Sequence, residues 1–223
     1  MHPATRGILV LALLVVLSSG GTAAHAHLPR VVSADSIVAV ERPGVSQAFY
    51  APMGRVPGVF SIEMAEPFSL YIGLLVPDLP GISTELTAEL TRTSGPVAGE
   101  GVMVLEGRDF PWEPFFEPFA GDRYLRGPHR EVDLPAGSYR VEVSGAPGVD
   151  RYVFVIGKRE EFTAADILHT VAVLPGIKRD FFGRSPFAAA LSLMGLAGAF
   201  ILFAFLLIGW ILYRRLRRTG SEN

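Results

Sequence analysis

The sequence contains no cysteine, and this absence excludes several kinds of site. Without thiols the chain forms no disulfide, thiolate metal centre or cysteine nucleophile, and no N-terminal cysteine can carry a lipid. Charged residues are also few, at 19% of the chain against 49% hydrophobic, and the net charge is −2. No cluster of basic residues is interleaved with aromatic ones, which excludes nucleic acid as a partner. The excess of apolar residues is typical of a folded domain combined with membrane-inserting segments.

Known catalytic signatures are absent as well. The sequence has no Gly-x-Ser-x-Gly, no His-Glu-x-x-His and no glycine-rich phosphate loop after a strand. Beyond residue 26 the histidines are His27, His129 and His169, and nothing in the sequence supports a Ser/His/Asp triad that uses them. We therefore predict a protein that is not an enzyme.

The N-terminus, residues 1–26, has the pattern of a secretory signal peptide. Arg6 supplies the positive start, and the apolar run 7–17 is too short to span a bilayer. Ala-His-Ala at 24–26 then places small residues where cleavage before His27 requires them. We expect the domain that follows to be exported.

The C-terminal segment 187–213 contains no charged residue and is long enough to cross the hydrocarbon core of a bilayer. It is followed at once by a basic cluster of the kind found on the cytoplasmic side, formed by Arg214, Arg215, Arg217 and Arg218. These two features predict a single-pass cell-membrane protein with a C-terminal transmembrane helix. Its N-terminal domain lies outside, residues 214–223 form a cytoplasmic tail, and the lipid bilayer is the partner of 187–213.

The region 27–157 shows alternation of period two and frequent turns, in a chain with 17 prolines and 24 glycines. In the segment 139–143, Tyr139, Val141 and Val143 should point inward, between charged residues that face water. Further segments share this pattern, and we expect strands at 58–64, 68–76, 86–93, 102–105, 130–134, 139–143 and 151–156. The predicted fold class is mainly β, an antiparallel β-sandwich or jelly roll.

Both ends of this domain carry recognisable segments. It opens with Val-Ser-Gln-Ala-Phe-Tyr at 45–50, followed by the strands 58–64 and 68–75, and it closes with Leu-Pro-Ala-Gly-Ser-Tyr-Arg-Val-Glu-Val at 134–143 and with 150–157. These segments resemble the first and last strands of prepeptidase C-terminal-type β-sandwich domains. The resemblance implies a sandwich fold and an accessory, non-catalytic role, and it carries over no functional residue. The chain has Pro-Gly-Val-Phe at 57–60 where that family carries Asp-x-Tyr/Phe. The whole arrangement also resembles exported single-pass proteins of uncharacterised function.

The segment 158–186 changes character and predicts short juxtamembrane helices. Thr163 can cap a helix over 164–173, Pro175 should end it, and 177–182 should form a second short turn. One placement of this segment is against the domain, as a packed connector. The other is on anionic lipid headgroups, through Lys178, Arg179, Phe181, Phe182 and Arg184.

A copper site is one hypothesis for function. Cleavage before His27 would leave its α-amine and imidazole free to chelate one Cu(II) ion, and cleavage after Ala24 would instead leave His25-Ala26-His27 as the chelating end. The Ala-His-Ala-His junction resembles that of periplasmic copper-binding β-sandwich proteins. Pro29 blocks a further backbone-amide ligand, so a strong site needs a second imidazole, for which His129 is the candidate. The alternative is that a histidine near a cleavage site has no role.

The segment 109–124 combines carboxylates, aromatics and prolines, and the prolines should keep it extended in an irregular loop. The carboxylates could hold calcium, with Asp109, Glu113, Glu117 and Asp122 as ligands. The aromatics could form a docking surface for a protein or glycan, made by Trp112, Phe115, Phe116, Phe119 and Tyr124. The interpretation that we favour is plainer: the aromatics plug one end of the sandwich and the carboxylates are solvated.

The function predicted from all these features is a membrane-anchored extracytoplasmic binding or structural module without catalytic activity. Its expected partner is an extracytoplasmic protein or a glycan. The alternative is a periplasmic or extracellular copper-binding protein that uses His27, and copper is the only cofactor that the sequence suggests.

Overall fold

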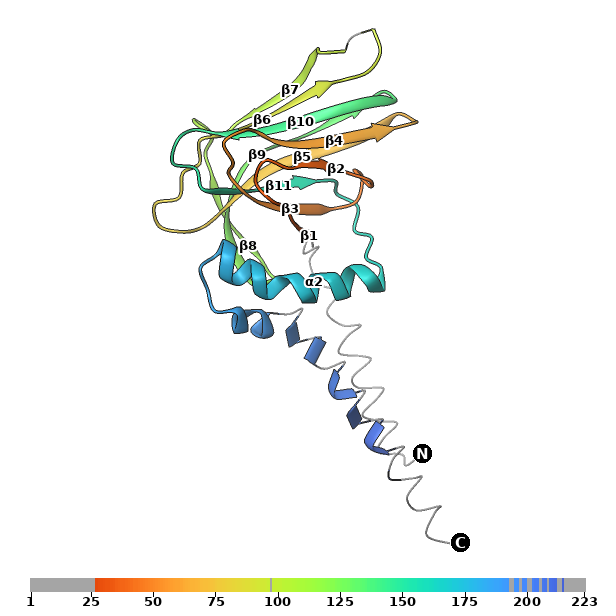
Figure 1. The fold of residues 1–223 in the computed structure, drawn as a ribbon, viewed down its shortest axis with the longest axis vertical. Helices are drawn as coiled ribbons and strands as arrows, with labels where there is room; N and C mark the ends of the chain where they lie inside the picture. The colour runs from red at the N-terminus through yellow and green to blue at the C-terminus, as the bar shows by residue number, and fades with distance from the viewer. Residues whose placement is uncertain are drawn as a thin grey trace.

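The computed structural model describes residues 27–96 and 98–192, together with single residues and short runs between 195 and 214. The predicted signal peptide, 1–26, lies outside the described residues, and so does the tail 214–223 apart from Arg214. The described chain forms two β-sheets with helices along one side (Figure 1). The predicted mainly β, sandwich-like fold is confirmed.

The strands are divided between a six-stranded and a five-stranded sheet. The six-stranded sheet has the order β1 (Leu28–Val31), β3 (Gln47–Pro52), β11 (Arg151–Ile156), β5 (Phe68–Pro77), β9 (Asp122–Leu134) and β8 (Glu113–Glu117). The five-stranded sheet has the order β2 (Ile37–Ala39), β4 (Gly58–Met64), β10 (Gly137–Gly145), β6 (Leu86–Arg92) and β7 (Gly101–Glu106). Most pairs are antiparallel, but β1 runs parallel to β3 and β2 runs parallel to β4. The predicted antiparallel pairing therefore holds except at these two edges.

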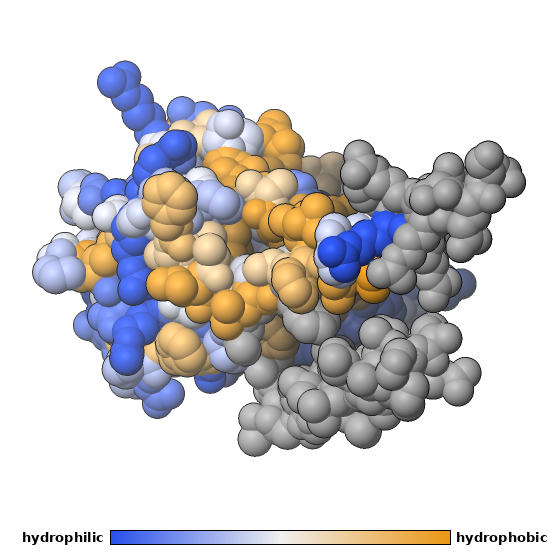
Figure 2. All heavy atoms as spheres, turned by 90° about the horizontal axis from the view of Figure 1, so that it is seen from below, coloured by the Kyte–Doolittle hydropathy of each residue, from blue (hydrophilic) through white to orange (hydrophobic). Residues whose placement is uncertain are grey.

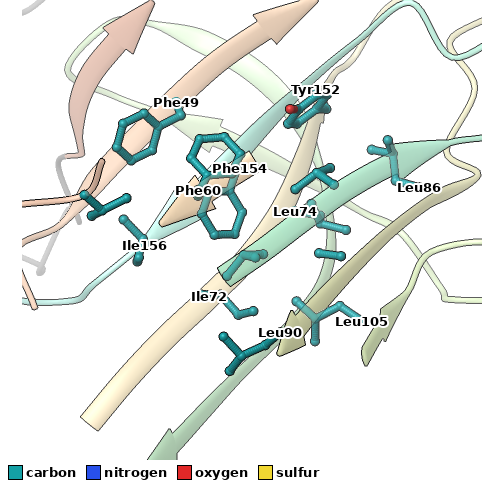
Figure 3. Close-up of a cluster of buried hydrophobic side chains, with 14 of the residues drawn as sticks. Phe49, Phe60, Ile72, Leu74, Leu86, Leu90, Leu105, Tyr152, Phe154 and Ile156 are labelled. Atoms are coloured by element: carbon teal, nitrogen blue, oxygen red, sulfur yellow. The ribbon is translucent and has the colours of Figure 1, made fainter. Parts of the chain in front are cut away.

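The main core lies between the two sheets. Tyr139, Val141 and Val143 of β10 are at most 1% exposed and point into it, as the alternation predicts. Phe60 of β4 meets Phe154 of β11 with ring centroids 4.4 Å apart. Figure 3 shows these rings beside Phe49, among aliphatic side chains from both sheets. Such alternating burial from two facing sheets is what holds a β-sandwich together.

A second core covers the opposite face of the six-stranded sheet. Along β11, Tyr152, Phe154 and Ile156 enter the main core. Val153 and Val155 lie in the second core, against Ile177, Phe181 and Phe182. These last residues belong to a helical layer, formed by α2 (Ala164–Gly176), the π-helical turn η1 (Ile177–Phe181) and the 3₁₀ helix η2 (Pro186–Leu191). Figure 1 shows α2 running across the lower side of the sheets.

The start of α2 follows the sequence prediction and its end does not. Thr163 caps the helix: its side chain accepts from the amide of Asp166, and the Asp166 carboxylate accepts from the amide of Thr163, both at 3.1 Å. Pro175 lies inside α2, which runs on to Gly176 and into η1. Leu174 and Ile177, on either side of it, are at most 4% exposed. Packing against the sheet thus outweighs the hydrogen bond that a proline removes.

The helical layer packs on the domain, which decides between the two placements left open above. Lys178, Phe181 and Phe182 are buried and cannot face lipid headgroups. Arg179 and Arg184 remain exposed. The helical layer therefore belongs to the folded domain as a third layer.

The segment 187–213 is described only in part. Its first residues lie in η2, a 3₁₀ helix that starts at Pro186 and is followed by an extended Ser192, so the prediction of one helix from Phe187 is wrong at its start. Several of its later residues lie outside the described set, and the described ones from Gly195 to Ile211 are helical. Among the described residues, no helix has both the length and the apolar character needed to cross a membrane.

Candidate functional site

A cavity of about 500 Å³ opens on the outer face of the six-stranded sheet, beside the helical layer. We call it the cationic cavity, because Arg126 of β9 and Lys158, which follows β11, line it together with two imidazoles. The imidazoles are those of His27 and His129. Tyr71 of β5 contributes a further part of the wall.

Aromatic rings hold the two permanent cations of this cavity in place. The guanidinium of Arg126 lies over the ring of Phe115, 4.1 Å from its centroid. The ammonium of Lys158 lies 4.9 Å from the centroid of Tyr71 and pairs with Glu131 at 2.5 Å. Within the described chain Arg126 pairs with no carboxylate. Its nearest acidic neighbour across the strands is Glu113 of β8, which forms no ion pair with it, so its donors remain available to an anion.

The imidazoles of the cationic cavity are hydrogen-bonded to neighbouring groups of the protein. His27 Nδ1 lies 2.6 Å from Ser46 Oγ, and His129 Nδ1 lies 3.1 Å from the carbonyl oxygen of Gly127. Burial raises the pKa of Tyr71, and the charges of Arg126 and Lys158 oppose that shift. Tyr71 is therefore a neutral hydroxyl at neutral pH.

A second cavity, of about 300 Å³, lies between the sheet and α2. It shares His27, Leu75 and Phe115 with the cationic cavity, so the two adjoin. Most of its walls are hydrocarbon, from side chains such as Ile167 and Leu174 of α2. We call it the apolar cavity.

The polar side chains of the apolar cavity are already engaged by the protein. The hydroxyls of Tyr50 and Tyr124 lie 2.6 Å apart, and Thr170 donates to the carbonyl oxygen of Asp166. The two oxygens of Glu117 accept from the amides of Phe119 at 2.9 Å and Ala120 at 2.7 Å. Burial raises the pKa of Glu117, and these two amides oppose that shift. Glu117 thus works as the cap of a turn.

Beside the apolar cavity, a buried ion pair joins the helical layer to the sheet. Lys178 Nζ lies 2.6 Å from Asp122 Oδ1, and these side chains are 1% and 0% exposed. Lys178 also donates to the carbonyl oxygen of Ala120, and Arg184 approaches Asp122 at 3.4 Å from the exposed side. Burial raises the pKa of Asp122, against the lowering effect of both cations. The charged ends of Lys178 and Asp122 therefore fix η1 to the start of β9.

The structure brings the two predicted copper ligands to one place. His27 and His129 both line the cationic cavity, although they lie far apart in the sequence. Arg126 and Lys158 line it too, and their charges repel a metal ion. Throughout the described part of the chain, no group of three or more His, Asp or Glu side chains is arranged to hold a metal.

The carboxylates of the predicted calcium site are separated by their surroundings. Asp109 and Glu113 are exposed. Glu117 caps a turn and Asp122 pairs with Lys178, as described above. The expected irregular loop is a strand in part: 113–117 form β8 and 122–124 begin β9, whereas 109–112 and 118–121 are turns or coil.

The aromatic residues of this segment also divide. Trp112 packs against the main core and donates to the carbonyl oxygen of Gly107 at 2.8 Å, as the plug interpretation expects. Tyr124 is 1% exposed in the second core, and Phe119 and the half-buried Phe115 line the apolar cavity. Phe116 is 53% exposed. These five side chains do not form one exposed docking surface.

Sequence reasoning missed the two cations that characterise the site. Arg126 was placed outside any strand, because the sequence pattern started β9 at Arg130 instead of Asp122. Lys158 falls in the segment 158–186, outside the predicted β-domain. One sequence feature indicates that the outer face of this sheet is covered. It is the uninterrupted apolar run of β11, which is typical of a strand that is covered on both faces.

No protein-family model matches the chain, and no curated protein matches it. Among solved structures, it is similar to a prepeptidase C-terminal domain of a collagenase from Bacillus anthracis. The sequence identity is 11%, the TM-score is 0.35, and the match covers 54% of this chain and 93% of that domain. This match bears the same domain name as the resemblance carried by the sequence segments.

Two further solved structures are similar at lower scores. One is a β-glucosidase from Paenibacillus barengoltzii, with 12% identity and a TM-score of 0.28 over 59% of this chain and 13% of the enzyme. The other is a surface-associated copper-binding protein of Methylomicrobium album BG8, with 8% identity and a TM-score of 0.28 over 56% of this chain and 98% of that one. At such scores neither match transfers a function to this chain.

Proposed function

We propose that this protein is a binding module without catalytic activity, held at the outer face of a cell membrane, and that its ligand occupies the cationic and apolar cavities. The observation that carries the proposal is the pair of adjoining cavities, of about 500 and 300 Å³. Ligand sites in proteins are typically clefts of about 300–1,000 Å³ with apolar walls and a few polar groups. The walls here come from the sheet and from α2, so the helical layer completes the site.

Anchoring in the membrane is the second part of the proposal. It is supported by the uncharged segment 187–213 and the arginines that follow it. It is also supported by the lower side of the domain, where Leu168, Phe187 and Leu191 are 72%, 84% and 81% exposed. Figure 2 shows apolar side chains gathered on this side, bordered by hydrophilic ones. An exposed apolar surface next to a membrane segment suits contact with lipid.

The topology can be tested with single cysteines, because the natural chain has none. We expect a membrane-impermeant thiol reagent to label Glu66→Cys in intact cells, since Glu66 is exposed on the domain. It should label Ser221→Cys, in the predicted tail, only after the membrane is opened. Labelling of both positions in intact cells would overturn the proposed topology.

Occupancy of the cavities can be tested by photo-crosslinking. The full chain in nanodiscs of zwitterionic lipid is irradiated with a photoreactive twelve-carbon alcohol and a matching acid, and the adducts are mapped by peptide mass spectrometry. The test variant is Ile167→Trp, because Ile167 lines the apolar cavity and a larger side chain would fill it. The control is Leu168→Trp, the next residue of the same helix, which is 72% exposed. Adducts on cavity residues should be lost in the first variant only, and equal labelling of both variants would contradict the proposal.

Copper binding is a second candidate function, favoured by the position of His27 and His129 in one cavity. The full chain, exported with its own signal, is dialysed after addition of Cu(II), and retained copper is measured by elemental mass spectrometry. We expect one ion per chain if the two imidazoles form the site, and His27→Ala and His129→Ala should each release it. Copper that is not retained, or that survives either substitution, excludes this pair of ligands.

A further inference from the structure

We propose that the ligand of the two cavities is an amphiphile with one hydrocarbon chain and an anionic headgroup. This inference rests on the proposed function and names the chemical class of ligand. The hydrocarbon chain would occupy the apolar cavity, and the headgroup would lie in the cationic cavity next to Arg126. Each half of the argument comes from a different set of residues.

The hydrocarbon half follows from the walls of the apolar cavity. Leu75 and Phe115 close it on the sheet side, and Phe162, Ile167 and Leu174 close it on the side of the helical layer. Its hydroxyl and carboxylate groups are bonded within the protein, as described above. A polar ligand group would therefore lose its hydrogen bonds to water here without gaining a partner in the protein. A hydrocarbon chain has no such bonds to lose, and its burial is favourable.

The anionic half follows from the charges of the cationic cavity. Lys158 shares its charge with Glu131, whereas the guanidinium of Arg126 forms no ion pair with a carboxylate within the described chain. A guanidinium favours carboxylates and phosphates because its donors form parallel hydrogen bonds to two oxygens.

The relative position of the two cavities selects an amphiphile over two separate ligands. Phe115 lines both cavities, and the guanidinium of Arg126 lies on its ring at 4.1 Å. A chain that passes Phe115 and Leu75 into the apolar cavity would leave its headgroup at the guanidinium. Glu117 is the one carboxylate that lines the apolar cavity among the described residues, and its two oxygens face backbone amides of its own turn. Its charge is thus partly compensated before a ligand arrives.

The inference is tested in the photo-crosslinking experiment by comparing the acid with the alcohol. The two probes have the same chain and differ only in headgroup charge. We expect the acid to label cavity residues at about tenfold lower concentration, since a hydrogen bond to a charged group contributes about 1.5 kcal/mol or more. Arg126→Gln should remove this preference. The matched control is Arg130→Gln, which removes the same charge from β9 at an exposed position outside both cavities and should keep it.

The outcomes separate the inference from the proposed function. If the alcohol labels the cavity as well as the acid does, or if Arg126→Gln leaves the preference intact, the anionic headgroup is refuted and the binding function stands. If neither probe labels cavity residues, both fall. Displacement of the acid probe by laurate points to a free fatty acid as the ligand. Displacement by lysophosphatidylglycerol alone points to a membrane lipid with an anionic phosphate.

Discussion

The buried pair of Lys178 and Asp122 gives a quantitative prediction about what holds the helical layer on the sheet. Replacing Lys178 by Met keeps a long side chain but leaves Asp122, which is 0% exposed, without its main partner. Breaking a buried ion pair by removing one partner costs about 3–5 kcal/mol. Arg184 can offset only a small part of this loss, because it lies 3.4 Å from Asp122 and is 52% exposed to water.

The loss should appear first in the helical layer, because this layer can detach while the sandwich stays folded. Amide hydrogen exchange of the full chain measures such local opening. At about 3 kcal/mol, protection of the η1 amides (Ile177–Phe181) should fall by more than about a hundredfold. Amides of β10 (Gly137–Gly145), which lies in the other sheet, should keep their protection.

The double variant Asp122→Leu/Lys178→Met separates the charge effect from lost packing. Replacing a buried pair by apolar side chains of similar volume is often neutral or stabilising, so η1 should regain protection. The pair of Lys158 and Glu131 is the control, since it is as short, at 2.5 Å, but its side chains are 52% and 45% exposed. We expect no measurable coupling between these two residues. The reasoning is refuted if Lys178→Met leaves exchange unchanged, or if the double variant is no better than either single one.

Further predictions concern the cap, a glycine and a buried carboxyl. Thr163→Ala should lower the midpoint of thermal unfolding by the equivalent of about 1 kcal/mol, because the amide of Asp166 loses its acceptor; an unchanged circular-dichroism melt would contradict this. Gly157→Ala should cost more than about 1–2 kcal/mol in urea unfolding, because Gly157 has φ +73° and a Cβ would lie 2.3 Å from the carbonyl oxygen of Val45; a cost below that of Thr163→Ala would count against it. Burial raises the pKa of Glu117 above its ordinary 4.5. Between pH 4.5 and the raised pKa of the folded state, the folded state therefore binds more protons than the unfolded state. The free energy of unfolding therefore falls as the pH rises through that window, and Glu117→Gln should remove this slope; a slope equal to that of the natural chain would rule out Glu117 as its source.

Strands with clear alternation and clear turns could be predicted from the sequence, and β4 and β11 have the predicted bounds. The first half of β9 could not be predicted in this way, because Gly127 and Pro128 have the pattern of a turn. In the structure the ladder between β5 and β9 shifts its register between Gly73 and Leu75, opposite these two residues. Such a bulge accommodates a proline, which has no amide hydrogen to give to the ladder. A long-range pairing therefore overrides a local turn signal.

The third layer was equally hidden from local patterns. Lys178 looked like a surface residue of a juxtamembrane turn, since a lysine is rarely buried without a partner. Its partner Asp122 lies 56 residues away in the sequence. Nothing in the spacing of either residue indicates that they meet. The same holds for the cavities, whose walls come from β1, β3, β5, β8, β9, β11 and the helical layer.

The two candidate ligands can be separated by one substitution with opposite effects. The sequence suggests His27 and His129 as metal ligands. They lie in a cavity whose two permanent charges, on Arg126 and Lys158, are positive. These charges repel Cu(II) and attract an anionic headgroup. Arg126→Gln should therefore weaken binding of the acid probe and tighten copper retention. Copper titration and crosslinking of the same preparation measure both effects. A variant that weakens both ligands alike would show that Arg126 acts through the shape of the cavity, on the ring of Phe115, and not through its charge.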